Sequence, residues 1–177
     1  VGVRIVRYSA TRFFSSFDAD WSPSGDQLVI ASDHEIVIWD IAGEVEDWIT
    51  SSETFYAGPD WAPDGQWIAY ASDENRIPAY AKNYAFSIFI RSLDGSTQRE
   101  MTAALRDHFS DAPDWSPDGK WLVFNASQMV SIPNPSSPGD KAFAMSDLFV
   151  VNVDHPEQLL NLTASPRYVS GDSDFNF

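Results

Sequence analysis

The stretch "DAPDWSPDGKWLVF", residues 111–124, decides the fold, because the chain contains close copies of it. The copies are "GPDWAPDGQWIAY" at residues 58–70 and "DADWSPSGDQLVI" at residues 18–30. In each copy Pro-x-Gly is a tight turn, since Pro presets φ, Asp or Ser bonds to the nearby backbone, and Gly accepts a positive φ. Three copies in register predict a repeat architecture.

Each copy continues with the same order of predicted strands. The strand after the turn is nearly continuous in apolar residues, as is typical of a strand covered on both faces. These strands are residues 27–32, 67–72 and 121–126. Third strands are predicted at residues 35–41, 86–93 and 147–153. Fourth strands are more polar, as edge strands usually are. They end at Ile49-Thr50, Met101-Thr102 and Leu162-Thr163.

Four-stranded units of about 40 to 50 residues with a buried first strand are the blades of a β-propeller. The predicted fold class is therefore an all-β propeller with three complete blades. Partial copies flank them, because "DSDFNF" at residues 172–177 mirrors "DADWSP" at residues 18–23. The predicted divisions are a preceding blade's last strand (1–10), blade 1 (11–50), blade 2 (51–102), blade 3 (103–163), and a connection with the next blade's first strand (164–177).

The repeats resemble the TolB-type, or WD40-like, propeller repeat. That pattern runs from an aromatic-Ser-Pro-Asp-Gly turn through an apolar strand and a Ser-Asp turn to a final Leu-Thr. Ser24 departs from it by replacing the turn Asp in the first copy. The resemblance implies a ring that commonly has six blades and an extracytoplasmic, periplasmic location.

Three blades leave two faces uncovered, since propellers close with about four to eight. The remaining blades could come from a longer parent chain, a second copy of this chain or a partner subunit. In a two-copy ring, residues 172–177 would compete with the partner's own first strand. That competition favours a longer parent chain.

The composition excludes several classes of partner. The 177 residues carry 26 acidic and 11 basic side chains, a formal net charge of -15. Nucleic acid is excluded, because phosphate neutralisation needs clustered Lys and Arg. Cysteine is absent, which removes disulfides, thiolate zinc sites and cysteine nucleophiles. No apolar run approaches the roughly 18 residues of a membrane span, so membrane insertion is not expected.

Insertions interrupt the repeat between second and third strands. This connection is Asp33-His34 in the first copy, but residues 73–85 in the second and 127–146 in the third. The segment "SIPNPSSPGDKAF" at residues 131–143 is rich in Pro and Ser, so no regular strand is expected there. Long loops on a rigid scaffold commonly carry binding residues. The partner-binding candidates are Arg76, Tyr80, Lys82, Tyr84, His108, Lys141 and Phe143.

An aspartate precedes the aromatic residue in each copy, at Asp20, Asp60 and Asp114. First strands line a propeller channel, so these carboxylates could bind a hard cation such as Ca²⁺, although no cofactor is required. The alternative is structural. Adjacent strand residues point to opposite faces, so these carboxylates would instead accept backbone N–H bonds from the next blade.

Three functions remain open. The first is a non-catalytic propeller that binds a protein or peptide at its loop-rich face. The second is a substrate-gating propeller of a larger hydrolase, such as a prolyl-oligopeptidase-like or tricorn-like peptidase. The third is a subunit of a larger assembly. The chain contains no Gly-x-Ser-x-Gly, phosphate-cradling glycine loop or His-Glu-x-x-His motif, and no catalytic residue is assigned.

Overall fold

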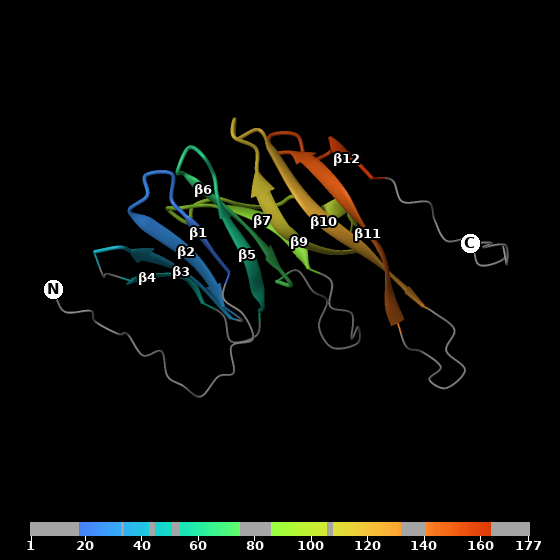
Figure 1. Cartoon of the computed structure of the whole chain (residues 1–177), viewed down its shortest axis with the longest axis horizontal. Helices are drawn as coiled ribbons and strands as arrows, with labels where there is room; N and C mark the ends of the chain where they lie inside the picture. The colour runs from blue at the N-terminus through green and yellow to red at the C-terminus, as the bar shows by residue number, and fades with distance from the viewer. Residues whose placement is uncertain are drawn as a thin grey trace, which may run out of the picture.

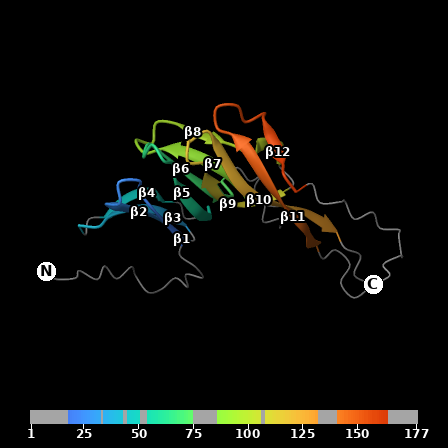
Figure 2. The ribbon, with the colours of Figure 1, turned by 45° about the horizontal axis from the view of Figure 1, so that its top comes forward.

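The structure is a computed structural model of three four-stranded antiparallel sheets (Figure 1). It describes residues 18–32, 34–42, 45–50, 54–74, 86–105, 108–131 and 141–163. In each sheet the strands follow chain order, which is the topology of a propeller blade. The sheets lie side by side in chain order (Figure 2). The predicted all-β propeller fold is confirmed.

The strands of blade 1 are β1 (Asp18–Trp21), β2 (Gln27–Ser32), β3 (Glu35–Asp40) and β4 (Val45–Thr50). Those of blade 2 are β5 (Tyr56–Trp61), β6 (Trp67–Ser72), β7 (Ser87–Ser92) and β8 (Gln98–Glu100). Those of blade 3 are β9 (His108–Trp115), β10 (Trp121–Ser131), β11 (Lys141–Asn152) and β12 (Leu159–Asn161). A short 3₁₀ helix, η1 (Ala103–Leu105), precedes β9.

The repeated turns join first to second strands. In blade 3 the Gly119 N–H donates to the Ser116 carbonyl at 2.8 Å, and Gly119 has a φ of 70°. The Ser116 hydroxyl oxygen accepts the Trp121 N–H at 3.0 Å. Ser22 makes the same contact with the Gln27 N–H at 3.0 Å in blade 1. The Ser-Pro-x-Gly pattern therefore encodes both the turn and the start of the second strand.

The final Thr of the repeat also has a structural role. The Thr102 hydroxyl oxygen accepts the Ile88 N–H at 2.9 Å, and that of Thr163 accepts the Leu148 N–H at 3.0 Å. Each contact continues the pairing of third and fourth strands by one more bond.

Two apolar seams hold the blades together, one on each side of blade 2. In the first, bulky side chains of blade 2 cover blade 1: Trp61, Ile68, Tyr70 and Phe89 pack on Val29, Ala31, Ile36 and Ile38. In the second, blade 3 covers blade 2 in the same way: Trp115, Leu122, Phe124 and Phe149 pack on Ala69, Ala71, Ile88 and Ile90. The large side chains belong to the later blade each time.

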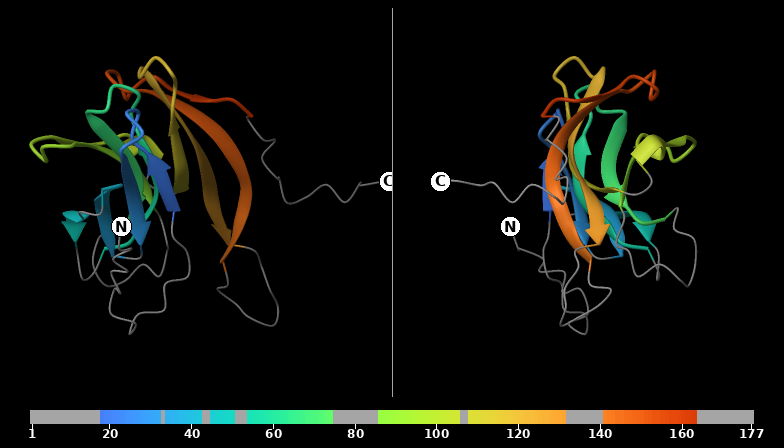
Figure 3. Two further views of the ribbon diagram at one scale, coloured as in Figure 1. Left: turned by 60° about the vertical axis from the view of Figure 1, so that its left-hand side comes forward. Right: turned by 90° about the vertical axis from the view of Figure 1, so that its right-hand side faces the viewer.

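The expectation that residues 131–143 contain no regular strand is wrong at both ends of that segment. Strands β10 and β11 continue into the predicted loop, where Met129 pairs with Phe143 and Ser131 with Lys141, past a bulge after Ser127. Figure 3 shows the two as a long curved hairpin. Because residues 128–131 and 141–146 contain few turn formers, they can extend the ladder. The Pro- and Ser-rich part, residues 132–140, lies outside the described residues, as do the predicted flanking strands at 1–10 and 164–177.

Candidate functional site

The first strands of the blades, β1, β5 and β9, lie beside one another and line a hollow of about 710 Å³. Its lining includes five aspartates: Asp18, Asp20, Asp60, Asp111 and Asp114. This is the position of the channel in a propeller, where first strands face the axis. The chain thus concentrates part of its negative charge on one concave surface.

Three of these aspartates join neighbouring blades. The Trp61 N–H donates to Asp20 Oδ2 at 2.8 Å, and the Trp115 N–H donates to Asp60 Oδ2 at 2.6 Å. The Gly58 N–H also donates to Asp18 Oδ2 at 3.2 Å. Each carboxylate accepts a backbone donor of the next first strand, which is the structural alternative expected from the sequence for Asp20 and Asp60.

Asp60 has an unusual protonation equilibrium. Burial raises its pKa to about 7, against the lowering effect of the Trp115 N–H. The nearby carboxylates of Asp20 and Asp114 raise the pKa further, as does a hydrogen bond between the Asp60 and Asp20 carboxyl groups. Near neutral pH, a proton therefore resides on Asp60 for part of the time.

A bulge in each of blades 2 and 3 shapes the hollow. Gly58 and Ala112 begin these bulges, each is followed by a Pro, and they have positive φ values of 54° and 49°.

 The bulge is clearest in the pairing registers, where two residues of β5 or β9 lie opposite one residue of the neighbouring strand. In blade 3 it brings Asp111 to the hollow. Burial raises the pKa of Asp111, against a hydrogen bond with Asn125 that lowers it.

The cation prediction for Asp20, Asp60 and Asp114 stays a prediction. Within the part of the chain that the structure describes, no group of three or more His, Cys, Asp or Glu residues is arranged to hold a metal ion. At Asp20 and Asp60, one carboxylate oxygen already accepts a backbone N–H.

The predicted partner-binding residues fall into two groups. Arg76, Tyr80, Lys82 and Tyr84 lie outside the described residues. The other three lie at the same end of blade 3: His108 begins β9, Lys141 begins β11, and Phe143 follows it in the hairpin. The structure therefore brings this second group to one end of a sheet.

The histidines have local contacts. The His108 ring lies edge-on to Phe149, with centroids 6.3 Å apart. His34 Nδ1 donates to the Thr54 carbonyl at 2.8 Å, and His155 lies 3.2 Å from the Glu157 carboxylate. These contacts place the three rings in different parts of the fold.

Asp111 lines the hollow, but the sequence did not predict it as a channel residue. The repeat singles out the carboxylate directly before the aromatic residue, which is Asp114 in blade 3, while Asp111 lies three residues earlier. The bulge adds one residue to β9, and this moves Asp111 to the hollow. The available signal was Pro59 and Pro113 in the first strands of blades 2 and 3, because a Pro within a strand is typical of a bulge or an edge.

Comparisons with known proteins agree with this architecture. The model of the WD domain, G-beta repeat, matches residues 12–40. The chain is similar to the Tol-Pal system protein TolB of Alcanivorax borkumensis, with 32% identity over 100 residues, 55% of this chain and 20% of that protein. It is also similar to the uncharacterized peptidase YuxL of Bacillus subtilis, with 27% identity over 159 residues, 71% of this chain and 24% of that protein.

A solved structure shares the fold. The tricorn protease matches with a TM-score of 0.58 and 18% identity over 78% of this chain and 13% of that chain. The chain spans between 16% and 38% of the lengths of the curated relatives that it matches. In the described residues, no helix has the length and apolar character of a membrane span. The repeats, the three blades and these similarities show a β-propeller whose repeats are similar to those of the TolB-type, WD40-like propellers.

Proposed function

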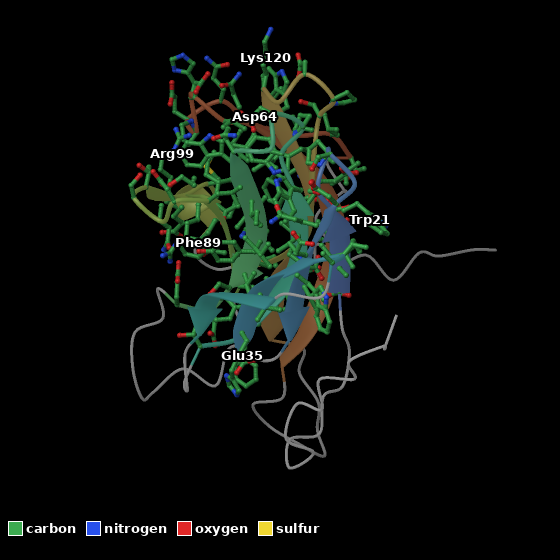
Figure 4. All side chains as sticks on the ribbon, turned by 90° about the vertical axis from the view of Figure 1, so that its left-hand side faces the viewer. Trp21, Glu35, Asp64, Phe89, Arg99 and Lys120 are labelled. Atoms are coloured by element: carbon green, nitrogen blue, oxygen red, sulfur yellow. The ribbon has the colours of Figure 1, made fainter. Side chains whose placement is uncertain are left out.

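We propose that the chain is a non-catalytic scaffold that binds a protein or peptide partner at the end of the blades where the long connections begin. The observation that carries this proposal is that the blades have tight turns at one end and long connections at the other. Asp64 and Lys120, in the tight turns, lie at one end, and Glu35, at the start of β3, lies at the other (Figure 4). The insertions of blades 2 and 3 follow β6 and β10 at the end away from these turns.

The scaffold beneath this end has a well-packed core. Tyr70, Phe89 and Phe124 are fully buried in the two seams. Densely packed sheets hold their side chains in fixed positions, so loops attached to them can present a defined surface. The arrangement therefore suits recognition of a partner by variable loops on a constant frame.

The charge of the chain favours a basic partner segment. The hollow carries five aspartates, and the whole chain has a formal charge of -15. Complementary charge speeds association and suppresses wrong partners more than it raises affinity. We therefore propose that the partner presents Lys or Arg to this scaffold.

Loop replacement tests the proposal. Residues 75–85 and 132–140 are replaced by short Gly-Ser connections, and partners captured by the parent chain are quantified on each variant. We expect binding to be lost while the circular dichroism and melting temperature stay close to those of the parent. A matched control, Lys120→Glu, changes a turn at the opposite end. If every partner remains bound to the loop variants, the proposal is wrong.

The similarity to the peptidase YuxL and the fold shared with the tricorn protease favour a second candidate, a propeller that gates substrate in a larger hydrolase. The complete open reading frame distinguishes the two. The hydrolase candidate requires a downstream Ser-Asp-His domain, and a fluorophosphonate probe should then label the longer product and leave the 177-residue chain unlabelled. A longer product without such a domain supports the scaffold.

The proposed location is extracytoplasmic, and the similarity to TolB is its support. Cell fractionation tests it. A product found with the cytoplasmic markers contradicts this location without affecting the binding proposal.

A further inference from the structure

Three tight turns of the chain contain the dipeptide Asp-Gly: Asp64-Gly65, Asp94-Gly95 and Asp118-Gly119. The three turns share their backbone contacts. In each, the Gly N–H donates to the carbonyl three residues earlier, and Oδ1 of the aspartate accepts the N–H two residues later. Differences in the reactivity of the three pairs therefore come from the side chains around them.

Asp-Gly is the dipeptide that most readily rearranges through a succinimide, because glycine has no side chain to hinder its nitrogen. The Gly nitrogen attacks the aspartate Cγ, so that an N–Cγ bond forms and a Cγ–O bond breaks. The carboxyl OH leaves as water with the proton of the nitrogen. Hydrolysis of the ring then gives aspartate or isoaspartate. The carboxyl group must be protonated for this loss of water, so contacts that keep it ionised slow the reaction.

Two of the three aspartates have such a contact with a serine hydroxyl. The Ser92 hydroxyl donates to Asp94 Oδ1 at 2.7 Å, and the Ser116 hydroxyl donates to Asp118 Oδ1 at 2.7 Å. These bonds are the main reason that the pKa of Asp94 falls to about 2 and that the pKa of Asp118 is also lowered. The turn of blade 2 has Ala62 at the position of these serines, so Asp64 receives no hydroxyl.

The glycine of the blade 2 turn also has the most space. A Cβ at Gly65 would meet nothing within 4 Å, whereas one at Gly95 would lie 3.0 Å from Arg91 Nη2 and one at Gly119 3.5 Å from Pro63 Cγ. Asp64 itself is exposed, in a turn at the end of the blades opposite Glu35 (Figure 4). The backbone of this turn can therefore rotate toward the attack geometry with the least hindrance.

We propose that Asp64-Gly65 is the preferred site at which the folded chain forms a succinimide and then isoaspartate. The inference concerns a covalent change and goes beyond the proposed function. The product exposes a new α-carboxylate, the group to which isoaspartyl methyltransferases transfer the methyl group of S-adenosylmethionine, leaving S-adenosylhomocysteine. Isoaspartate adds one carbon to the main chain, so it should break the bond from the Gly65 N–H to the Ala62 carbonyl and loosen the turn between β5 and β6.

Peptide mapping of the aged chain tests the proposal. The folded 177-residue chain is held in mildly acidic buffer below its melting temperature and then digested with trypsin. Cuts after Arg76, Arg91 and Arg106 place each Asp-Gly pair in a separate peptide. Isoaspartate in each peptide is measured by mass spectrometry and by methyl transfer from labelled S-adenosylmethionine. We expect it to form at Asp64 about two- to tenfold faster than at the other pairs, the factor that corresponds to one side-chain hydrogen bond.

Exchanging the residue that distinguishes the turns gives matched variants. Ala62→Ser supplies the missing hydroxyl and should slow the reaction at Asp64 by about two- to tenfold, while Ser116→Ala should accelerate it at Asp118 by a similar factor. Because Ser116 also accepts the Trp121 N–H, loosening of the turn can contribute to that acceleration, and Ala62→Ser is the decisive variant. The melting temperature of each variant confirms that it is folded.

Full denaturation is the control for local sequence. In denaturant the three pairs should react at similar rates, because the serine contacts and the crowding are lost. If Asp64 is still the fastest there, its preference comes from local sequence and the proposal is wrong. Isoaspartate that forms in the folded chain as fast at Asp94 or Asp118 as at Asp64 also overturns it. A folded Ala62→Ser chain that reacts at the parent's rate excludes the missing hydroxyl as the cause.

Discussion

Asp60 combines a stabilising contact with an unfavourable environment. Its carboxylate accepts the Trp115 N–H at 2.6 Å, so it ties blade 3 to blade 2. Burial and the carboxylates of Asp20 and Asp114 raise its pKa to about 7. Folding is therefore favoured most while Asp60 is protonated, because burying its charged form is costly, and this predicts a measurable dependence on pH.

The free energy of unfolding should fall as the pH rises from about 4 to about 7 and then level off. In this window the folded chain retains a proton on Asp60, while the unfolded chain, with the ordinary pKa of 3.8, does not. Stability falls with pH wherever the folded state binds more protons. Asp60→Asn keeps an oxygen for the Trp115 N–H and should flatten the profile.

Chemical denaturation at several pH values provides the measurement. Part of the slope should persist, because burial also raises the pKa of Asp111 and of Glu74. Asp64→Asn, in an exposed turn, is the control and should keep the parent slope. An Asp60→Asn profile as steep as the parent's would exclude Asp60 as a source of the dependence.

Gly58 should tolerate a side chain less well than the turn glycine Gly25. Both have positive φ values, 54° and 76°. A Cβ on Gly58 would lie 3.3 Å from the Ala112 Cα, whereas one on Gly25 meets nothing within 4 Å. Gly25→Ala should cost about 1 kcal/mol through backbone strain, and Gly58→Ala about 1 kcal/mol more through crowding. Thermal unfolding compares them, and equal losses would contradict the crowding.

At the scale of the elements, β6 and β10 differ in what covers them. Ala71 of β6 is buried under blade 3, while Asn125 of β10, at the same repeat position, is exposed. Ala71→Leu should therefore destabilise the monomer by about 1 to 3 kcal/mol through overpacking, and Asn125→Leu by less than about 0.5 kcal/mol. Denaturant titration measures both. A similar loss at the two positions would show that the seam can relax.

The elements that could be predicted from sequence are those set by neighbouring residues along the chain. The Ser-Pro-x-Gly turns and the strands after them follow from turn chemistry and apolar runs, as at Ser116 and Gly119. The extension of β10 and β11 was not predicted. The many Pro and Ser residues at 132–140 favoured a loop for the whole connection, whereas Met129 on one side of that segment pairs with Phe143 on the other. Asp111 was missed because a bulge shifts the register, and register depends on the partner strand.

At the scale of the whole molecule, blade 2 is the only described blade covered on both faces. Repeat proteins gain stability from each neighbouring interface. Amide exchange measured by mass spectrometry should therefore be slowest in β6 and β7 and faster in β2 and β3 of blade 1. The experiment is done at a concentration where the chain is monomeric. Uniform exchange across the blades would mean that the three unfold together.

Strand β5 carries the acceptor and the donor of two successive seams on adjacent residues, Asp60 and Trp61, and the same Asp-Trp pair stands in β1 and β9. Any such unit can therefore follow another of its kind without a new interface having to arise. An in-frame duplication of one blade would insert a ready-made neighbour, and a deletion would rejoin two compatible ones. The number of blades in such a chain can therefore change by single genetic events. Only those products whose blades close into a ring would be retained.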